Sequence, residues 1–69
     1  MTVIKYTVLT IKKNYNYNFN EKLAKKYNFD LKADVKEMKE ILAHLHKCNI
    51  KDIDVKIYKD GKDVTSCYL

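Results

Sequence analysis

The sequence predicts a single α+β domain, residues 1–69, in which one long amphipathic helix packs on one face of a three-stranded β-sheet. Two patterns lead to this prediction: a helical stripe of apolar residues within 31–48, and β-rich segments near both ends of the chain. A chain of 69 residues has room for one domain and buries only about 60% of its unfolded surface. We therefore expect a working surface or strand edge rather than an enclosed substrate pocket.

The first segment, Thr2 to Lys13, is predicted to be a strand because it is rich in Val, Ile, Thr and Tyr. Apolar residues fall on both of its faces, as expected for a strand that is covered on both sides. We favour a central strand of this kind. The alternative is a bulge near Thr7 that switches its inward face.

Asn alternates strictly with aromatic residues from Asn14 to Asn20. A period of two allows a strand extension, with three aromatic side chains on one side: Tyr15, Tyr17 and Phe19. Because Asn is poor in strands and favoured in turns, a loop anchored by the same aromatic rings fits the pattern equally well.

Two helices are expected in the middle of the chain. A short one over Glu21–Tyr27 has Asn20 as its N-cap and Asn28 in the left-handed position that ends it. A longer one over Leu31–Cys48 begins at the N-cap Asp30. Its apolar stripe has helical spacing and is widened by Ile41: Leu31, Val35, Met38, Leu42 and Leu45.

The last stretch is predicted to be a β-hairpin. Asp60-Gly61 is a strong two-residue turn signal, and it pairs Ile57 with Val64 and, further along, Ile53 with Tyr68. The element order is then strand, short helix, long helix, strand, strand. A right-handed crossover through the helices would place the first strand parallel to the second.

The charge balance favours a negatively charged partner. The chain carries a net charge of +5, with 14 basic side chains that are all Lys. Lys suffices for non-specific attraction to phosphate, whereas specific base reading relies heavily on Arg. A composition rich in Lys, Asn, Ile and Tyr is also typical of AT-rich coding, which leads to the hypothesis of a viral or mobile-element source.

The segment Leu23-Ala24-Lys25-Lys26-Tyr27-Asn28-Phe29 resembles the first helix and turn of bacterial helix–turn–helix repressors. The resemblance implies a second helix that reads the major groove of DNA. It fails downstream, because Asp34 and Glu37 stand where that pattern needs apolar residues, and no Arg is present to contact base edges. We therefore interpret the two helices as elements of a small core.

No motif indicates catalysis, a metal site or a cofactor, so we expect a protein that is not an enzyme. His44 and Cys48 lie four residues apart on one helix, and Cys67 could approach from the last strand. The predicted hairpin register turns Cys67 away from the inner face, and the ligands are too few for zinc. One Gly is too few for a phosphate-binding loop. We also expect no secretory signal and no membrane helix, and hence a location in the cytoplasm of a cell or host.

Two surfaces are predicted to bind a partner: the aromatic run of Tyr15, Tyr17 and Phe19, and a basic hairpin face of Lys56, Tyr58, Lys59 and Lys62. Aromatic rings beside Asn suit adaptable protein contacts, and the alternative is that these rings close the core. The sequence thus favours a small binding protein that inhibits or adapts nucleic-acid-handling machinery, such as a virus- or plasmid-encoded inhibitor of a host defence nuclease. The alternative is direct, non-specific or single-strand nucleic-acid binding. Dimerisation through a sheet edge is a further hypothesis.

Overall fold

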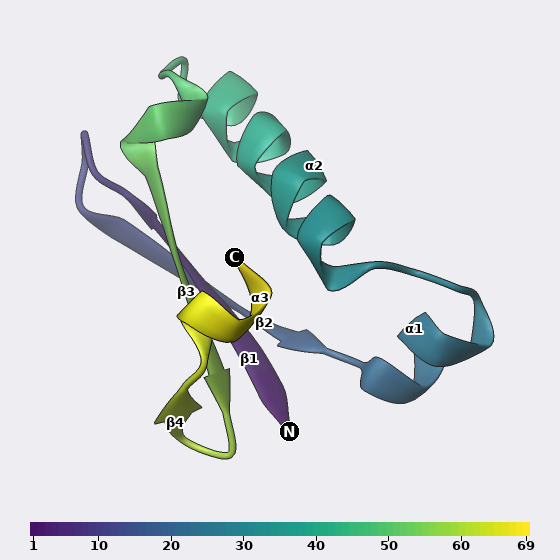
Figure 1. Ribbon diagram of the computed structural model, residues 1–69. Coiled ribbons are helices and arrows are strands. Elements are labelled where there is room, and N and C mark those ends of the chain that lie inside the picture. The colour runs from purple at the N-terminus through teal and green to yellow at the C-terminus, as the bar shows by residue number, and fades with distance from the viewer.

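The computed structural model describes residues 1–69 and has a four-stranded antiparallel sheet with one long helix across one face (Figure 1). The strands are β1 (Thr2–Val8), β2 (Lys13–Phe19), β3 (Ile53–Lys59) and β4 (Lys62–Asp63), in the spatial order β2-β1-β3-β4. The other elements are the helices α1 (Glu21–Lys26), α2 (Leu31–Leu45) and α3 (Thr65–Tyr68) and the 3-10 turn η1 (Ile50–Asp52). The α+β class is confirmed, and the prediction of three strands is wrong by one strand. None of the helices combines the length and the apolar character needed to cross a bilayer.

β1 is central, as the sequence predicts, but only one of its faces is covered. Ile4, Tyr6 and Val8 are fully buried on the face toward α2, whereas the residues between them are half-buried on a bare face. β2 and β3 both pair with β1 in antiparallel fashion, so the expected parallel pairing of the first strand is wrong. The chain reverses before it enters the helices, and α1 and α2 therefore connect β2 to β3, which run parallel to each other with β1 between them.

The reversal at residues 9–12 was not visible in the sequence. The turn holds Leu-Thr-Ile-Lys, with neither Gly nor Asn to indicate it. Lys12 adopts a left-handed backbone with φ 52°, which non-glycine residues rarely do. Leu9 and Ile11, expected on the second face of one long strand, lie exposed in this turn, which explains why that strand seemed apolar on both sides.

α2 supplies the second layer of the core. The Asp30 side chain accepts a hydrogen bond from the Lys32 N–H at the start of the helix, which confirms the predicted cap. The helix packs its apolar stripe on the inner face of β1 and β3 through one cluster of buried residues: Ile4, Tyr6, Val8, Leu31, Val35, Leu42, Ala43, Ile53, Val55 and Ile57. Ile41 and Leu45, predicted to belong to the stripe, are 51% and 63% exposed. They lie on the flank of the helix, beyond the reach of the sheet.

The end of α2 also differs from the prediction. Lys47 takes the left-handed position at φ 52°, and the Cys48 N–H donates to the Ala43 carbonyl at 2.9 Å. This pattern is a Schellman motif, which closes the helix at Leu45 rather than at Cys48.

The predicted hairpin register is confirmed at the turn, where Lys59 pairs with Lys62 and Tyr58 with Asp63. The second strand then stops, because the Asp63 carboxylate accepts hydrogen bonds from the N–H and hydroxyl of Thr65 at 2.9 and 2.6 Å. The Thr65 hydroxyl in turn accepts from the Ile57 N–H at 2.9 Å, in place of a strand partner. The chain enters α3, so the expected pairing of residues 53 and 68 is wrong, although Val64 and Tyr68 still pack against the core.

Two leucines of α2 test the placement of the core. Leu42→Ala removes a side chain that is 2% exposed, and we expect the free energy of unfolding to fall by roughly 2–4 kcal/mol. Leu45→Ala removes one that is 63% exposed, and we expect a change of about 0.5 kcal/mol or less. Urea unfolding in dilute solution measures both. Equal losses at the two positions would contradict the packing described here.

The Asp63 carboxylate gives a pH-dependent contribution to stability. Its hydrogen bonds from the Thr65 hydroxyl and N–H lower its pKa from 3.8, because they favour the charged form. Because the pKa of Asp63 is lower in the folded than in the unfolded chain, its charged form stabilises the fold. This contribution is fully present above pH 3.8 and is lost as the pH falls through the folded-state pKa. We expect Asp63→Ala to be less stable than the parent at pH 7, with the gap closing below pH 3.8, as measured by thermal unfolding across pH. A gap that stays constant with pH would refute this role.

Candidate protein-binding surface

The aromatic run lies on the strand β2, so the strand interpretation is confirmed over the loop. Tyr15 pairs with Tyr6 and Phe19 with Thr2, which places both aromatic rings on the face that α2 covers. Tyr15 and Phe19 are half-buried and pack against the core. The Tyr15 hydroxyl also forms a 2.8 Å hydrogen bond with Nε2 of His46 at the end of α2. These two side chains therefore help close the core.

Tyr17 is the exposed member of the run. It pairs with Ile4 but is 40% exposed, because it lies on the edge strand where the cover of α2 ends. Its ring meets the edge of the Tyr6 ring, with centroids 5.7 Å apart. Burial, followed by the negative charge of Asp34 on α2, raises the pKa of Tyr6.

The four residues of the predicted basic hairpin face do not form one patch. Side chains alternate along β3, so Lys56 and Tyr58 lie on the bare face of the sheet, whereas Lys59 and its partner Lys62 lie on the other. The Lys59 Nζ lies 3.8 Å from the carboxylate of Glu21, the first residue of α1. The prediction of a single patch is wrong because it ignored this alternation.

The bare face of the sheet is mostly polar. Its central row aligns Asn16, Lys5 and Lys56 on β2, β1 and β3. The Thr7 hydroxyl donates to the Asn14 side chain at 2.8 Å in the next row. No helix covers these residues (Figure 1), so they face solvent in the isolated chain.

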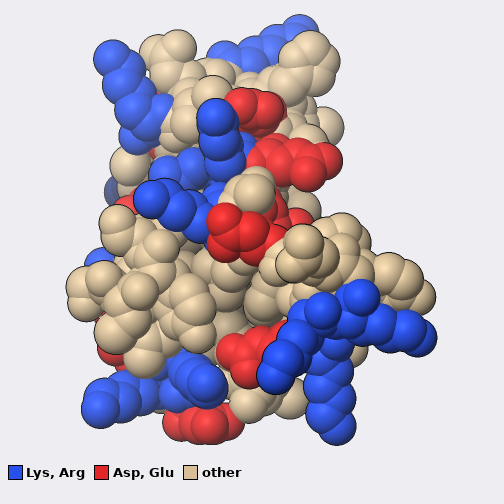
Figure 2. Space-filling model, turned by 45° about the vertical axis from the view of Figure 1, so that its right-hand side comes forward, with Lys and Arg blue, Asp and Glu red and all other residues tan.

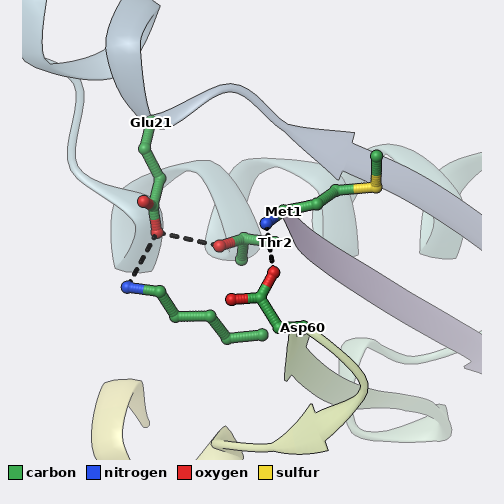
Figure 3. Close-up of polar contacts among 5 residues, drawn as sticks. Met1, Thr2, Glu21 and Asp60 are labelled. Atoms are coloured by element: carbon green, nitrogen blue, oxygen red, sulfur yellow. Dashed lines mark hydrogen bonds and ion pairs between the residues drawn. The ribbon is translucent and has the colours of Figure 1, made fainter.

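α1 and the residues after it project beyond the end of β2 (Figure 1). The helix is fixed at its first turn, where the Asn20 side chain caps the Leu23 N–H at 3.1 Å and the Thr2 hydroxyl donates to Glu21 at 2.8 Å (Figure 3). Ala24 is the one residue of α1 that is buried. The anchoring is therefore mainly polar and confined to the start of the helix.

Three large apolar side chains of this projection remain exposed. Leu23 is 47%, Tyr27 59% and Phe29 65% exposed, and the two rings lie 6.2 Å apart. The Lys26 ammonium lies 5.4 Å from the centre of the Tyr27 ring. We name Leu23, Tyr27 and Phe29 the α1 patch.

The α1 patch is accompanied by positive charge, because α1 also carries Lys22, Lys25 and Lys26. In Figure 2 the side of the molecule that holds α1 is turned forward. Blue Lys side chains gather beside uncharged ones at the lower right, and blue and red alternate over much of the remaining face. Blue side chains also lie at the top and on the left of the view, several of them next to red ones, so the lower right holds the densest positive cluster but not the only one.

Sequence reasoning missed the α1 patch as a binding surface. The signal was present, because Leu23 and Tyr27 lie one helical turn apart and yet are interleaved with lysines. A six-residue helix with three Lys has little apolar surface with which to bury both residues. Spacing alone indicated a core contact, and only the position of α1 past the end of the sheet shows that the core does not reach it.

Cys48 and Cys67 are free thiols, and no three of the His, Cys, Asp and Glu side chains lie close enough together to hold a metal ion. The hollows on the surface are open and are lined by solvent-facing side chains, as at Glu37, Ile41 and Leu45 on α2. The surfaces, rather than any cavity, are the candidates for function.

Comparison with known proteins assigns this chain to no family. No protein-family model, no curated protein and no solved structure matches this chain. Any functional proposal therefore rests on the residues and geometry of this chain itself.

Tyr15 and Tyr17 test the division of the aromatic run. Tyr15→Phe removes the hydrogen bond to His46, and we expect the free energy of unfolding to fall by about 1 kcal/mol. Tyr17→Phe is the matched control, since no hydrogen bond is formed by its hydroxyl, and we expect little change. Chemical unfolding compares the two variants. A larger loss from Tyr17→Phe would show that the roles of the two rings are reversed.

Proposed function

We propose that this chain is a small, non-catalytic binding protein that inhibits or adapts a larger protein through direct contact. The observation that carries the proposal is the exposed α1 patch: Leu23, Tyr27 and Phe29 are 47–65% exposed on a projecting segment. Aromatic side chains of this kind are frequent among the residues that dominate protein–protein affinity.

The cost of keeping this segment ordered supports the proposal. Fixing the backbone of each residue costs about 1–2 kcal/mol of conformational entropy. In an ordered segment this cost is normally offset by the burial of apolar side chains. The segment between β2 and α2 buries Ala24 alone, and Ala24 lies outside the main core cluster. A partner that covers Tyr27 and Phe29 would supply the missing burial, because adjacent exposed apolar residues mark interaction sites.

The charge around the patch supports a partner with an acidic contact face. Lys22, Lys25 and Lys26 would attract carboxylates and speed association. Within that class we propose nucleic-acid-handling machinery as the narrower target, because nucleases hold their metal ions in carboxylate-rich sites. An inhibitor of a host defence nuclease encoded by a virus or plasmid fits this charge and the small size of the chain.

A second candidate, direct nucleic-acid binding, is favoured by one observation. Lys5 and Lys56 lie side by side on the bare sheet face, next to the asparagines of β2. Such a face attracts phosphate without reading sequence. Asp54 and Asp63 on the same face oppose that attraction, so we rank this candidate second.

The test is capture of partner proteins from host lysate with the tagged chain, with and without nuclease, read by mass spectrometry. We expect one stoichiometric protein that stays bound after nuclease. A Tyr27→Ala, Phe29→Ala double variant should lose that protein, with at least about tenfold weaker binding, because truncating two contact rings removes 1.4 kcal/mol or more.

The matched control is a Leu9→Ala, Ile11→Ala double variant. These side chains are 53% and 54% exposed, similar to Tyr27, but they lie in the turn at the opposite end of β2. The control should retain the partner. Equal loss from both variants would remove the α1 patch from the proposal. Release of every partner by nuclease would favour the second candidate, and Lys5→Ala and Lys56→Ala should then each flatten the salt dependence of nucleic-acid affinity.

A further inference from the structure

We propose that two copies of this chain associate through antiparallel pairing of their β2 strands, about a two-fold axis that passes through Asn16. The sheet order places β2 at an edge, so its outer row of backbone N–H and C=O groups has no strand partner. Pairing would join the four strands of each copy into one continuous sheet. The inference is independent of the α1 patch, since it uses residues 13–19 and α1 begins at Glu21.

The sequence of β2 is self-complementary. Asn14-Tyr15-Asn16-Tyr17-Asn18 reads the same in both directions. A two-fold axis at the central Asn16 therefore places each Tyr15 opposite Tyr17 of the second copy, and each Asn14 opposite Asn18. The same face of the sheet then continues from one copy to the other: the aromatic rings of both copies lie on the face that α2 covers, and the Asn amides lie on the bare face.

This register is also the one that pairs the whole strand. Centring the axis on Asn16 matches all seven residues of β2, from Lys13 to Phe19, with their counterparts. Moving it to Tyr15 or Tyr17 keeps the faces matched but leaves two residues at one end of each strand facing non-strand residues. In the full register Lys13 faces Phe19 of the second copy, so no like charges are opposed. Cross-strand aromatic pairs add to the stability of such a ladder.

β2 lacks the usual features that protect an edge strand. Proteins block free edges with charged residues, Pro or bulges. β2 has one charged residue, Lys13 at its first position, no Pro, and an unbroken register with β1. On the opposite side of the sheet, β4 pairs only with Tyr58 and Lys59, and the rest of β3 carries Asp54 and Lys56, charged residues of the kind that protect an edge.

Apolar side chains beside β2 point to the same partner. Lys36 and Lys39 of α2 border a hollow with Ile50 and Leu69, on the β3 side of the helix. By helical spacing Ile41 and Leu45 lie on the opposite flank, toward β2. Tyr17, Ile41 and Leu45 are 40%, 51% and 63% exposed in the single chain. A second copy placed against β2 would bring the same flank of its own α2 alongside and cover these residues.

Sedimentation equilibrium of the full chain and two Asn-to-Asp variants tests the proposal. Asn16→Asp places two carboxylates opposite each other on the two-fold axis. Within each copy the same carboxylate faces Lys5, so the monomer fold is retained. We expect a concentration-dependent dimer for the parent and a dimer Kd raised roughly tenfold for Asn16→Asp. Added salt should narrow that difference.

Asn18→Asp is the matched control, with the same change of charge on the same face of the same strand. Its carboxylate would face Asn14 of the second copy, and we expect its dimer Kd to stay within about twofold of the parent. A parent that remains monomeric at all concentrations would overturn the proposal. Equal weakening by the two variants, or an unchanged Kd for Asn16→Asp, would overturn the two-fold register. Neither variant touches the α1 patch, so loss of the dimer and loss of the protein partner are separate results.

Discussion

The contact between α2 and the inner face of β1 and β3 is the interaction on which the rest of the structure depends. Leu31, Val35 and Leu42 pack there against fully buried side chains such as Ile4 and Ile57. Burial of a large aliphatic side chain stabilises the fold by about 1.5–3 kcal/mol, and no second apolar layer exists to replace it. The two-layer arrangement follows directly, because one helix of 15 residues can cover only one face of the sheet.

This single layer of cover determines what remains free. The bare face of the sheet, the outer edge of β2 and the projecting α1 all lie outside the contact. Each is polar or half-exposed for the same reason. A chain this short has only enough apolar residues to build one core layer, and that layer is as wide as a single helix. The three surfaces differ in chemistry. The bare face carries amides and Lys, and the β2 edge carries backbone groups beside Tyr17. The segment from α1 to Phe29 carries the rings of Tyr27 and Phe29 next to the lysines of α1.

Patterns that depend on local chemistry were readable in the sequence. The caps Asn20 and Asp30 and the Asp60-Gly61 turn are where those residues place them. Of the predicted stripe of α2, Leu31, Val35 and Leu42 are buried. Features that depend on tertiary context were not readable. Lys12 gives no turn signal, and Thr65 ends a strand by a hydrogen bond to a neighbouring strand. The sequence pointed to the rings of β2 as a binding surface, with closure of the core as the alternative, and Tyr15 and Phe19 do pack against the core. The α1 patch was not predicted, because Leu23 and Tyr27 have the spacing of a core contact.

The most direct test of this account is hydrogen exchange of the backbone amides in the free protein. α1 lies outside the core that α2, β1 and β3 form, since Ala24 is its one buried residue and lies outside the core cluster. We expect the amides of β1, and those amides of β3 that are hydrogen-bonded to β1, to exchange only by global unfolding. The amides of Ala24 to Phe29 should exchange orders of magnitude faster through local opening. If the amides of α1 were instead protected as strongly as those of β1, the segment would belong to the core. That result would contradict the proposal that α1 is kept outside the core in order to bind a partner.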